Sequence, residues 1–166
     1  SFGFAKNPQG PANLMTRNFL FAANDSSEVR RPSVYSPGET VFITFEVDGF
    51  KRDGKKVWIQ EDLNVQYPNN EVAIKLENIN DFQKEMENEG SIKFENNIVI
   101  PPNADLGRYT LTITLRDLIS RQELKEQRFF YVQQPAPGPP PPAIVPTPDD
   151  NADGTGSPGN EETDEN

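Results

Sequence analysis

Carboxylates are the plausible acid or base groups of this sequence. Its 166 residues include no Cys and no His, which excludes thiol nucleophiles, Ser-His-Asp catalysis and Cys/His zinc sites. Glu46 and Asp48 share one parity of an expected strand, and Glu61 and Asp62 are neighbours on the next. Two carboxyl groups about 5–9 Å apart across a cleft could hydrolyse a glycoside. Carboxylates on a solvent-exposed sheet face, in contrast, only make that face hydrophilic. We predict the second arrangement, and therefore a protein that is not an enzyme.

A second group of oxygen-bearing side chains lies near the end of the chain. Asp149, Asn151 and Asp153 precede Gly154 in the pattern D-x-N-x-D-G, which supplies oxygens at alternate positions and a glycine for the sharp turn of a calcium loop. The twelfth position, however, is Asn160 rather than the usual bidentate Glu, and no amphipathic helix flanks the segment. A solvated acidic tail is therefore the expectation and a weak Ca²⁺ site the alternative, and we expect no other cofactor.

The charges are distributed unevenly along the chain. All 16 Lys and Arg precede Gln134, whereas residues 135–166 hold 7 of the 26 Asp and Glu. The first 134 residues are therefore almost balanced, which argues against a nucleic-acid surface, because such a surface needs clustered cations. No run of 18 apolar residues occurs, so we expect no membrane insertion. Because the sequence starts without Met or a signal segment, we expect either that an exported chain has lost its leader or that the sequence was trimmed.

Apolar and polar residues alternate in several segments that turn-forming residues separate. Val41, Ile43, Phe45 and Val47, for example, share one parity within residues 40–48, which is the period of a strand with one buried face. The pattern predicts strands over residues 17–23, 40–48, 55–66, 72–76, 91–100, 107–117 and 122–132. About seven strands with turns between them favour an all-β antiparallel sandwich.

Residues 80–89 interrupt the alternation. Ile79, Phe82 and Met86 follow one another at spacings of three and four, and Gly90 ends the segment. These spacings are typical of a helix. We therefore predict one short helix at this place, crossing the end of a sheet.

The composition changes after Gln134. Eight prolines occur in residues 135–148, which favours an extended polyproline rod that acts as a spacer or docks into an aromatic groove of another protein. Residues 149–166 are acidic and contain no aromatic residue, so we expect a disordered tail. The predicted organisation is a flexible lead-in over 1–16, a sandwich over 17–134, a linker over 135–148 and the acidic tail over 149–166.

Three aromatic residues are the candidate binding residues. Trp58, Phe42 and Tyr67 would form a patch suited to a protein or a sugar if they faced outward on one sheet, and otherwise they belong to the core. A further candidate is the segment Phe129–Val132, which we expect to be an edge or return strand. An uncovered edge can accept a strand from another chain.

Asp105, Gly107 and Tyr109 lie in the pattern D-x-G-x-Y-x-L. This pattern resembles the tyrosine corner of immunoglobulin-like domains, in which the Tyr bonds back to the chain just before it. Trp58 follows Ile43 by 15 residues and precedes Leu111 by 53, which resembles the Cys, Trp and Cys spacing of such domains. The resemblance implies an immunoglobulin-like antiparallel β-sandwich in which apolar contact replaces the disulfide and Trp58 is in the core. Apolar Val57 and Ile59 have the opposite parity and favour Trp58 on the surface, so both placements stay open.

A wider pattern extends over roughly residues 30–132. It comprises a Y-x-P-G-E turn (residues 35–39), an Asp-Gly turn (residues 53–54) and an I-P-P-x-A-x-x-G-x-Y-T-L segment (residues 100–111). This pattern resembles a family of uncharacterised exported bacterial proteins. The resemblance implies a periplasmic, cell-surface or extracellular module but no activity.

The function that we expect is therefore that of a non-catalytic module. It would bind or assemble with another envelope or extracellular protein through its loops or an edge strand. The alternatives are a structural spacer in a surface assembly, or a carbohydrate-binding module that uses exposed aromatic residues.

Overall fold

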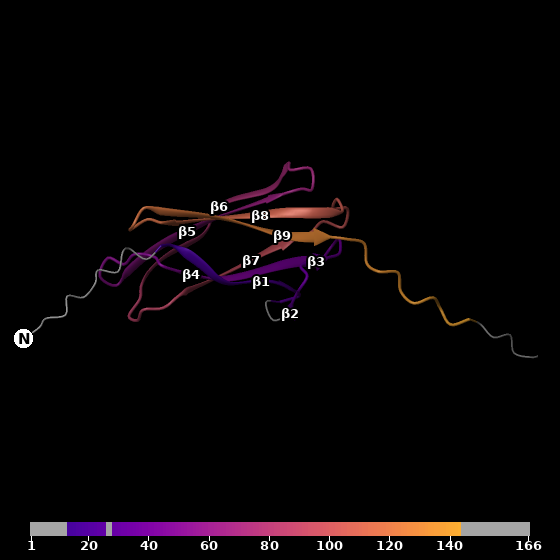
Figure 1. The fold of residues 1–166 in the computed structure, drawn as a ribbon, viewed down its shortest axis with the longest axis horizontal. Coiled ribbons are helices and arrows are strands. Elements are labelled where there is room, and N and C mark those ends of the chain that lie inside the picture. The colour runs from indigo at the N-terminus through magenta and orange to yellow at the C-terminus, as the bar shows by residue number, and fades with distance from the viewer. Residues whose placement is uncertain (1–12, 26–27, 144–166) are drawn as a thin grey trace, which may run out of the picture. The chain divides into compact units, whose positions relative to one another are not determined.

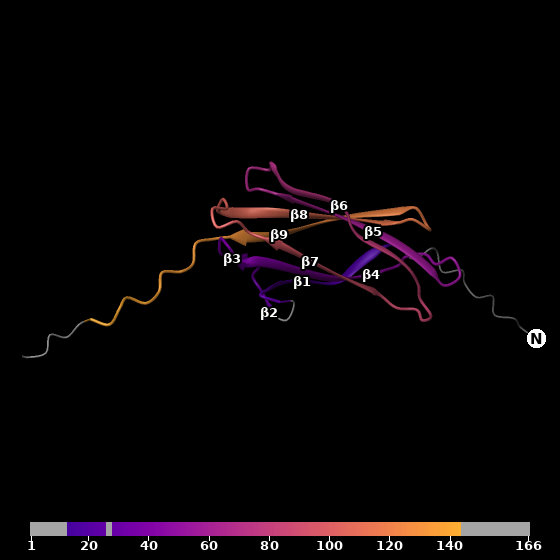
Figure 2. The same cartoon turned by 180° about the vertical axis from the view of Figure 1, so that it is seen from behind.

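The chain folds into two stacked β-sheets, which Figures 1 and 2 show from opposite sides. The computed structural model describes residues 13–25 and 28–143. Its strands are β1 (Met15–Ala23), β2 (Glu28–Val29), β3 (Val34–Tyr35), β4 (Thr40–Asp48), β5 (Lys56–Gln66), β6 (Val72–Glu85), β7 (Ile92–Val99), β8 (Gly107–Asp117) and β9 (Gln122–Val132). The described residues form no helix, and accordingly none that is long and apolar enough to cross a membrane.

The strand order is β2-β1-β4-β7 in one sheet and β3-β9-β8-β5-β6 in the other. All neighbouring strands are antiparallel except β3 and β9, which run parallel. The prediction of an all-β immunoglobulin-like sandwich is confirmed. Two of the nine strands, β2 and β3, have only two residues each. Segments this short contain no alternating pattern from which a strand could be predicted.

The core lies between the inner faces of the two sheets. The predicted alternation produces it directly, since Val41, Ile43 and Val47 of β4 are completely buried opposite Leu111 and Leu115 of β8. Burying one such aliphatic side chain stabilises a fold by about 1.5–3 kcal/mol. Four aromatic rings close the core near the end of β9: Tyr109 stacks on Phe130 with centroids 5.2 Å apart, and Tyr35 and Tyr67 meet these two rings edge-on.

The predicted helix over residues 80–89 is wrong. Residues 80–85 belong to β6, which pairs antiparallel with β5. The spacing of Ile79 and Phe82 imitates a helix because the ladder has a bulge here: three residues of β6, between Leu76 and Asn80, lie opposite the single residue Asp62. Asn78 in the bulge has φ 51°, and Ile79, also in the bulge, packs against the core, so an apolar residue outside the alternation precedes Phe82 by three positions.

The tyrosine corner has the expected geometry. The hydroxyl of Tyr109 donates a hydrogen bond to the carbonyl oxygen of Asp105 at 2.9 Å. Gly107 has φ +134°, a conformation that side-chain-bearing residues rarely adopt. Ile43 and Leu111, which the sequence resemblance aligns with the usual cysteines, are both completely buried.

The chain divides into two compact units, with the boundary between Pro135 and Ala136. The first unit contains every described strand. In the second, residues 136–143 are exposed and have no regular secondary structure. The sandwich therefore carries all the packed surfaces of the described chain.

We predict that Gly107→Ala destabilises the sandwich by about 1–3 kcal/mol, because the substitution strains a positive φ. The added Cβ would also lie 3.0 Å from the Pro68 ring. Urea unfolding followed by circular dichroism measures the change. Gly90→Ala is the matched control, since a Cβ there meets nothing within 4 Å and Gly90 has no positive φ; equal effects of the two substitutions would contradict the prediction.

Candidate functional site

The candidate catalytic carboxylates are distributed over different faces of the sandwich. Glu46 and Asp48 lie on the outer face of β4, where Glu46 accepts a hydrogen bond from Asn18 and Asp48 pairs with Arg17 at 2.9 Å. Glu61 and Asp62 are consecutive on β5, so they point to opposite faces of the sheet. Neither pair thus consists of two carboxyls that face each other across a cleft.

No group of three or more acidic residues in the described ranges could hold a metal ion. The proposed calcium ligands Asp149, Asn151 and Asp153 lie outside the described residues. The weak Ca²⁺ site in the tail therefore stays a prediction.

The three candidate aromatic residues do not form one patch. Phe42 lies on the outer face of the four-stranded sheet, since its neighbours Val41 and Ile43 point inward. Trp58 lies on the outer face of the five-stranded sheet for the same reason, and Tyr67 packs against Tyr109 with ring centroids 5.9 Å apart.

Trp58 is half-buried. Of the two placements that the sequence left open, the structure therefore has the one on the surface and not the one in the core. Its indole nitrogen donates a hydrogen bond to Asp81 at 2.7 Å. The side chain lines a pocket of about 390 Å³ together with residues that include Asp53, Gln83 and Glu85. An indole beside amide and carboxylate groups offers apolar contact together with hydrogen-bonding groups, which is a combination found in small-molecule sites.

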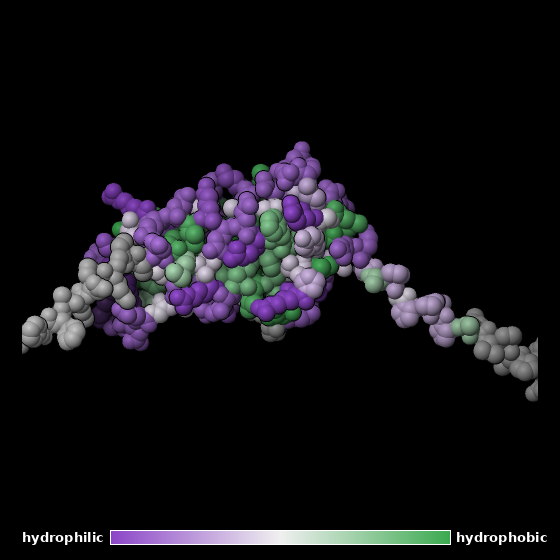
Figure 3. All heavy atoms as spheres, in the orientation of Figure 1, coloured by the Kyte–Doolittle hydropathy of each residue, from purple (hydrophilic) through white to green (hydrophobic). Residues whose placement is uncertain are grey.

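The outer face of the five-stranded sheet is mostly hydrophilic along the top of the view in Figure 3. A groove of about 480 Å³ lies on this face, lined by β5, β6, β8 and β9. At the groove, Asp62 accepts two hydrogen bonds from Arg116, at 2.5 and 2.7 Å. This contact, together with the amide of Asn78, lowers the pKa of Asp62 below its usual value. Asp62 and Arg116 therefore neutralise each other, and both are less able to bind an external ion.

A buried carboxylate joins the two sheets. Glu61 points inward from β5 and is fully buried. The side-chain amides of Asn80 on β6 and Asn96 on β7 each donate one hydrogen bond to it, both at 2.6 Å. Asn80 also donates to the side-chain oxygen of Asn96 at 3.0 Å.

Opposing effects act on this carboxylate. Burial raises the pKa of Glu61 to about 7, although the hydrogen bonds from Asn80 and Asn96 act in the opposite direction. This cluster was not predicted from the sequence, although a signal was present. Position 61 continues the buried parity of Ile59 and Leu63, so a charged residue there had to be buried.

The prediction that Phe129–Val132 is an edge open to another chain is wrong. Strand β3 pairs with β9 through Val34 and Tyr35. The nitrogen of Tyr131 donates to the carbonyl of Ser33, and the nitrogen of Gln133 donates to the carbonyl of Tyr35, both at 2.9 Å. The backbone groups at this end of β9 are therefore already paired.

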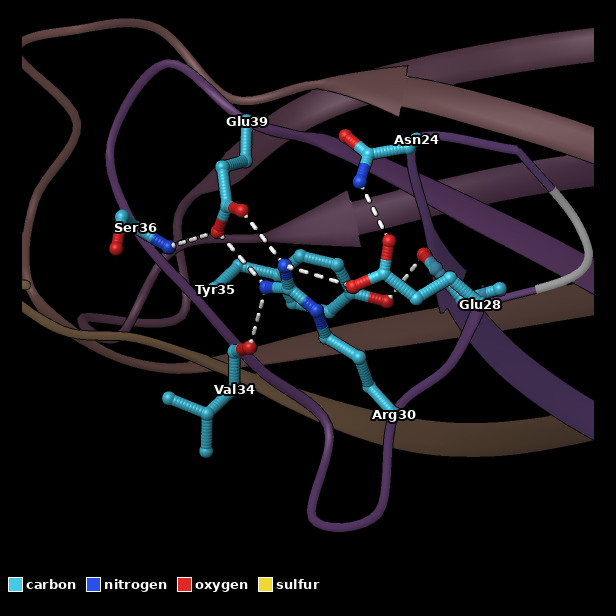
Figure 4. Close-up of polar contacts among 8 residues, drawn as sticks. Asn24, Glu28, Arg30, Val34, Tyr35, Ser36 and Glu39 are labelled. Atoms are coloured by element: carbon cyan, nitrogen blue, oxygen red, sulfur yellow. Dashed lines mark hydrogen bonds and ion pairs between the residues drawn. The ribbon is translucent and has the colours of Figure 1, made fainter.

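Figure 4 shows the side chains that hold β3 in this position. Arg30 makes a bidentate pair with Glu39, at 2.7 and 2.8 Å, and also donates to the carbonyl of Val34. Its guanidinium lies 4.8 Å from the centre of the Tyr35 ring, and Glu39 in turn accepts a hydrogen bond from the nitrogen of Ser36. The Y-x-P-G-E turn is thus a structural clamp that includes Arg30, which sequence analysis did not single out.

The charges of this clamp stabilise one another. The hydrogen bonds from Arg30 hold the pKa of Glu39 below its usual value, while burial raises the pKa of Tyr35 to about 12. Tyr35 donates its hydroxyl hydrogen to the carbonyl oxygen of Ala22 at 2.7 Å. Every polar group named here has a partner within the protein, so we assign to the clamp a structural role.

Strand β7 forms an edge of the four-stranded sheet. It pairs with β4 over eight consecutive residues without a bulge. Ile100, just after it, donates to the carbonyl of Glu39 and accepts from the nitrogen of Gly38. Because backbone direction alternates along an antiparallel strand, the N–H and C=O groups of Lys93, Glu95, Asn97 and Val99 point away from β4.

The other strands at the borders of the two sheets differ from β7. Strand β2 has two residues, β6 has two register shifts, and β9 is covered by β3 at its end. Among the described strands, β7 is thus the border strand that is regular and uncovered along its whole length, whereas in β9 only residues 122–130 lie beyond the part that β3 covers. It is the best candidate for a contact with another chain.

No family model and no curated protein matches this chain. Among solved structures, an alkylpurine DNA glycosylase of Pseudomonas fluorescens bound to DNA with an abasic-site analogue is similar, with a TM-score of 0.50, 12% identity, and coverage of 74% of this chain and 31% of that one. A Bacteroides uniformis β-glucuronidase has a TM-score of 0.46 and 16% identity, with coverage of 67% and 12%.

An immunoglobulin-like protein of Pseudomonas aeruginosa has a TM-score of 0.38 and 11% identity, with coverage of 75% of this chain and 99% of that one. The chain spans less than a third of the length of the two enzymes. At these identities the likeness concerns the fold alone.

We predict that the free energy of unfolding falls as the pH rises from about 4.5 to 7. Between its unfolded pKa and its folded pKa of about 7, Glu61 binds a proton in the folded chain but not in the unfolded one. The resulting loss is on the order of 3 kcal/mol or less. Urea unfolding at a series of pH values measures it.

Glu61→Gln should reduce this slope, because the variant has no ionisable group at position 61. The sequence contains no His, so no imidazole titrates in the same range. An unchanged slope in the variant would show that other groups cause the pH dependence.

Proposed function

We propose that this domain is a non-catalytic assembly module that joins another polypeptide chain along the edge of β7. The observation that carries the proposal is the unpaired row of backbone groups on a long, regular strand. Such an edge forms main-chain hydrogen bonds with an added strand, which supply affinity without a deep pocket. The open edges of β2 and β6 are shorter or irregular and support pairing less well, while residues 122–130 of β9 form a second regular edge on the other sheet.

We also propose that the module works outside the cytoplasm, in the periplasm, at the cell surface or in the medium. The resemblance of residues 35–39 and 100–111 to exported bacterial proteins supports this location. In such a protein the proline-rich residues 135–148 would serve as a spacer between the sandwich and its neighbours.

We predict that a photo-reactive amino acid in place of Asn97 forms cross-links to a second chain in extracts of the source cells. Asn97 is exposed at the open edge, so its side chain would lie beside an added strand. Cross-linked products are measured by denaturing electrophoresis and mass spectrometry. The same amino acid in place of Lys125, which is exposed on the other sheet, is the positional control.

A second variant tests whether the contact needs the backbone edge. Glu95→Pro removes an N–H that points away from β4, and proline is tolerated at such edge positions. The cross-link at position 97 should then decrease at least fivefold while circular dichroism stays unchanged. A cross-link that persists in a folded Glu95→Pro protein would contradict strand addition.

We propose carbohydrate recognition at Trp58 as a second candidate function. The supporting observation is the half-buried indole in a pocket of about 390 Å³ that also contains Gln83 and Glu85. Stacking of a sugar ring on an indole face combines apolar contact with hydrogen bonds at the ring edge. This function would use the outer face of the five-stranded sheet and not β7.

We predict that a binding oligosaccharide shifts the fluorescence emission of the protein, since Trp58 is its only tryptophan. A panel of neutral and acidic oligosaccharides is titrated while emission is recorded. Gln83→Ala should weaken a positive response about tenfold and keep the fluorophore intact. No shift with any sugar of the panel would remove this candidate.

A further inference from the structure

We propose that the chain that β7 accepts is a second copy of this protein. The two β7 strands would pair antiparallel about a two-fold axis at Phe94, joining two four-stranded sheets into one continuous sheet. This inference rests on the proposed function, because it requires that the β7 edge is available to another chain.

The backbone of β7 fits this arrangement. Lys93 and Glu95 both direct their N–H and C=O groups away from β4, as the alternation from Ile100 requires. In an antiparallel pair centred on Phe94, Lys93 lies opposite Glu95 of the second copy, and Glu95 lies opposite Lys93 of the second copy. These are hydrogen-bonded pairs, so each exchanges two backbone bonds.

The charges select this register. Lys93 and Glu95 project from the outer face of the sheet, and within one chain they form an exposed ion pair at 2.6 Å. Pairing about Phe94 places opposite charges directly across from each other twice, which stabilises neighbouring strands. A register centred on Glu95 would instead place the two Glu95 carboxylates opposite each other, and like charges in that position are destabilising.

The inner face also tolerates the pairing. Phe94 points into the sandwich, where it stacks on Phe45 with centroids 5.6 Å apart and meets Phe82 at 6.5 Å. At the two-fold axis the two Phe94 residues would form a non-hydrogen-bonded pair, in which side chains lie closer together. Aromatic pairs at such positions favour strand association.

Charged residues on an edge strand often prevent pairing, and this role must be distinguished from the one proposed. Charged side chains on an edge, lysine above all, oppose pairing, and so do charges that point inward; the proposed register offsets this because each charge meets an opposite one. In β7 the two charges point outward, and their order is self-complementary. The strand also has no bulge and no proline, which are further features that protect an edge.

Charge reversal tests the proposal on the full chain. Sedimentation velocity at about 10–500 μM protein and low salt measures the monomer–dimer equilibrium. The wild-type protein should form a dimer that dissociates more readily as salt is added, because exposed ion pairs are screened. Lys93→Glu and Glu95→Lys should each weaken the dimer about tenfold or more, since each turns two attractive pairs into repulsive ones.

Two further samples exclude a general loss of fold. The double variant Lys93→Glu/Glu95→Lys should regain the dimer, because it restores opposite charges across the axis. A mixture of the two single variants should form heterodimers in preference to either homodimer, as native mass spectrometry can count. Lys125→Glu, which has the same change of net charge as Lys93→Glu on a different sheet, should leave the dimer unchanged.

A wild-type protein that stays monomeric at about 500 μM would overturn the proposal. A dimer whose dissociation constant is unchanged by the charge reversals would overturn it as well. If the protein is monomeric and Asn97 still cross-links to a different protein in a manner sensitive to Glu95→Pro, the assembly function stands with another partner. If neither dimer nor cross-link forms, the proposed function falls together with this inference.

Discussion

The packing of two alternating apolar faces against each other is the constraint on which the rest of this structure depends. Residues such as Ile43 on β4 and Leu111 on β8 are completely buried between the sheets. Because side chains alternate along a strand, each buried residue forces its neighbours outward. Trp58 is on the surface for this reason: it lies between Val57 and Ile59, which are both fully buried. The same constraint separates Trp58 and Phe42, which lie on the outer faces of different sheets.

Glu61 occupies an inward position in that pattern, and its surroundings compensate for the burial of a carboxyl group. A buried polar group without partners is costly, and here Asn80 and Asn96 supply one hydrogen bond each. The two amides come from β6 and β7, which belong to different sheets. The cluster therefore connects the sheets at the side where both have an edge strand, and it does so with directed bonds rather than with apolar contact.

The sheets of an open sandwich end in border strands, and in this protein the border strands differ in how far their backbone groups are covered. The clamp of Arg30 and Glu39 holds β3 against the end of β9, so a local turn motif closes a contact between residues almost 100 positions apart. Strand β6 is made irregular by the bulge opposite Asp62. Strand β7 has neither device, and its backbone groups at Lys93, Glu95 and Asn97 stay available. A candidate interface is therefore defined by which edges the fold has covered.

Most of the fold could be predicted from local patterns. Strands β4, β5, β8 and β9 follow period-two alternation, and the residues 105–109 indicate the tyrosine corner, whose hydrogen bond is present. The end of β6 could not be predicted, because a bulge adds Ile79 to the apolar residues outside the alternation, and its spacing to Phe82 imitates a helix. The two-residue strands β2 and β3 could not be predicted either, since a segment of two residues has no period.

The sequence by itself determined the type of the fold and the absence of His- and Cys-based chemistry. Periodicity and residue type are local properties, which is why they can be read along one chain. Only the tertiary structure decided which residues meet: that Glu61 joins Asn80 and Asn96, that Arg30 pairs with Glu39, and that β3 covers the end of β9 while β7 is left open. These contacts depend on strand order and register, which arise from packing between segments far apart in the sequence.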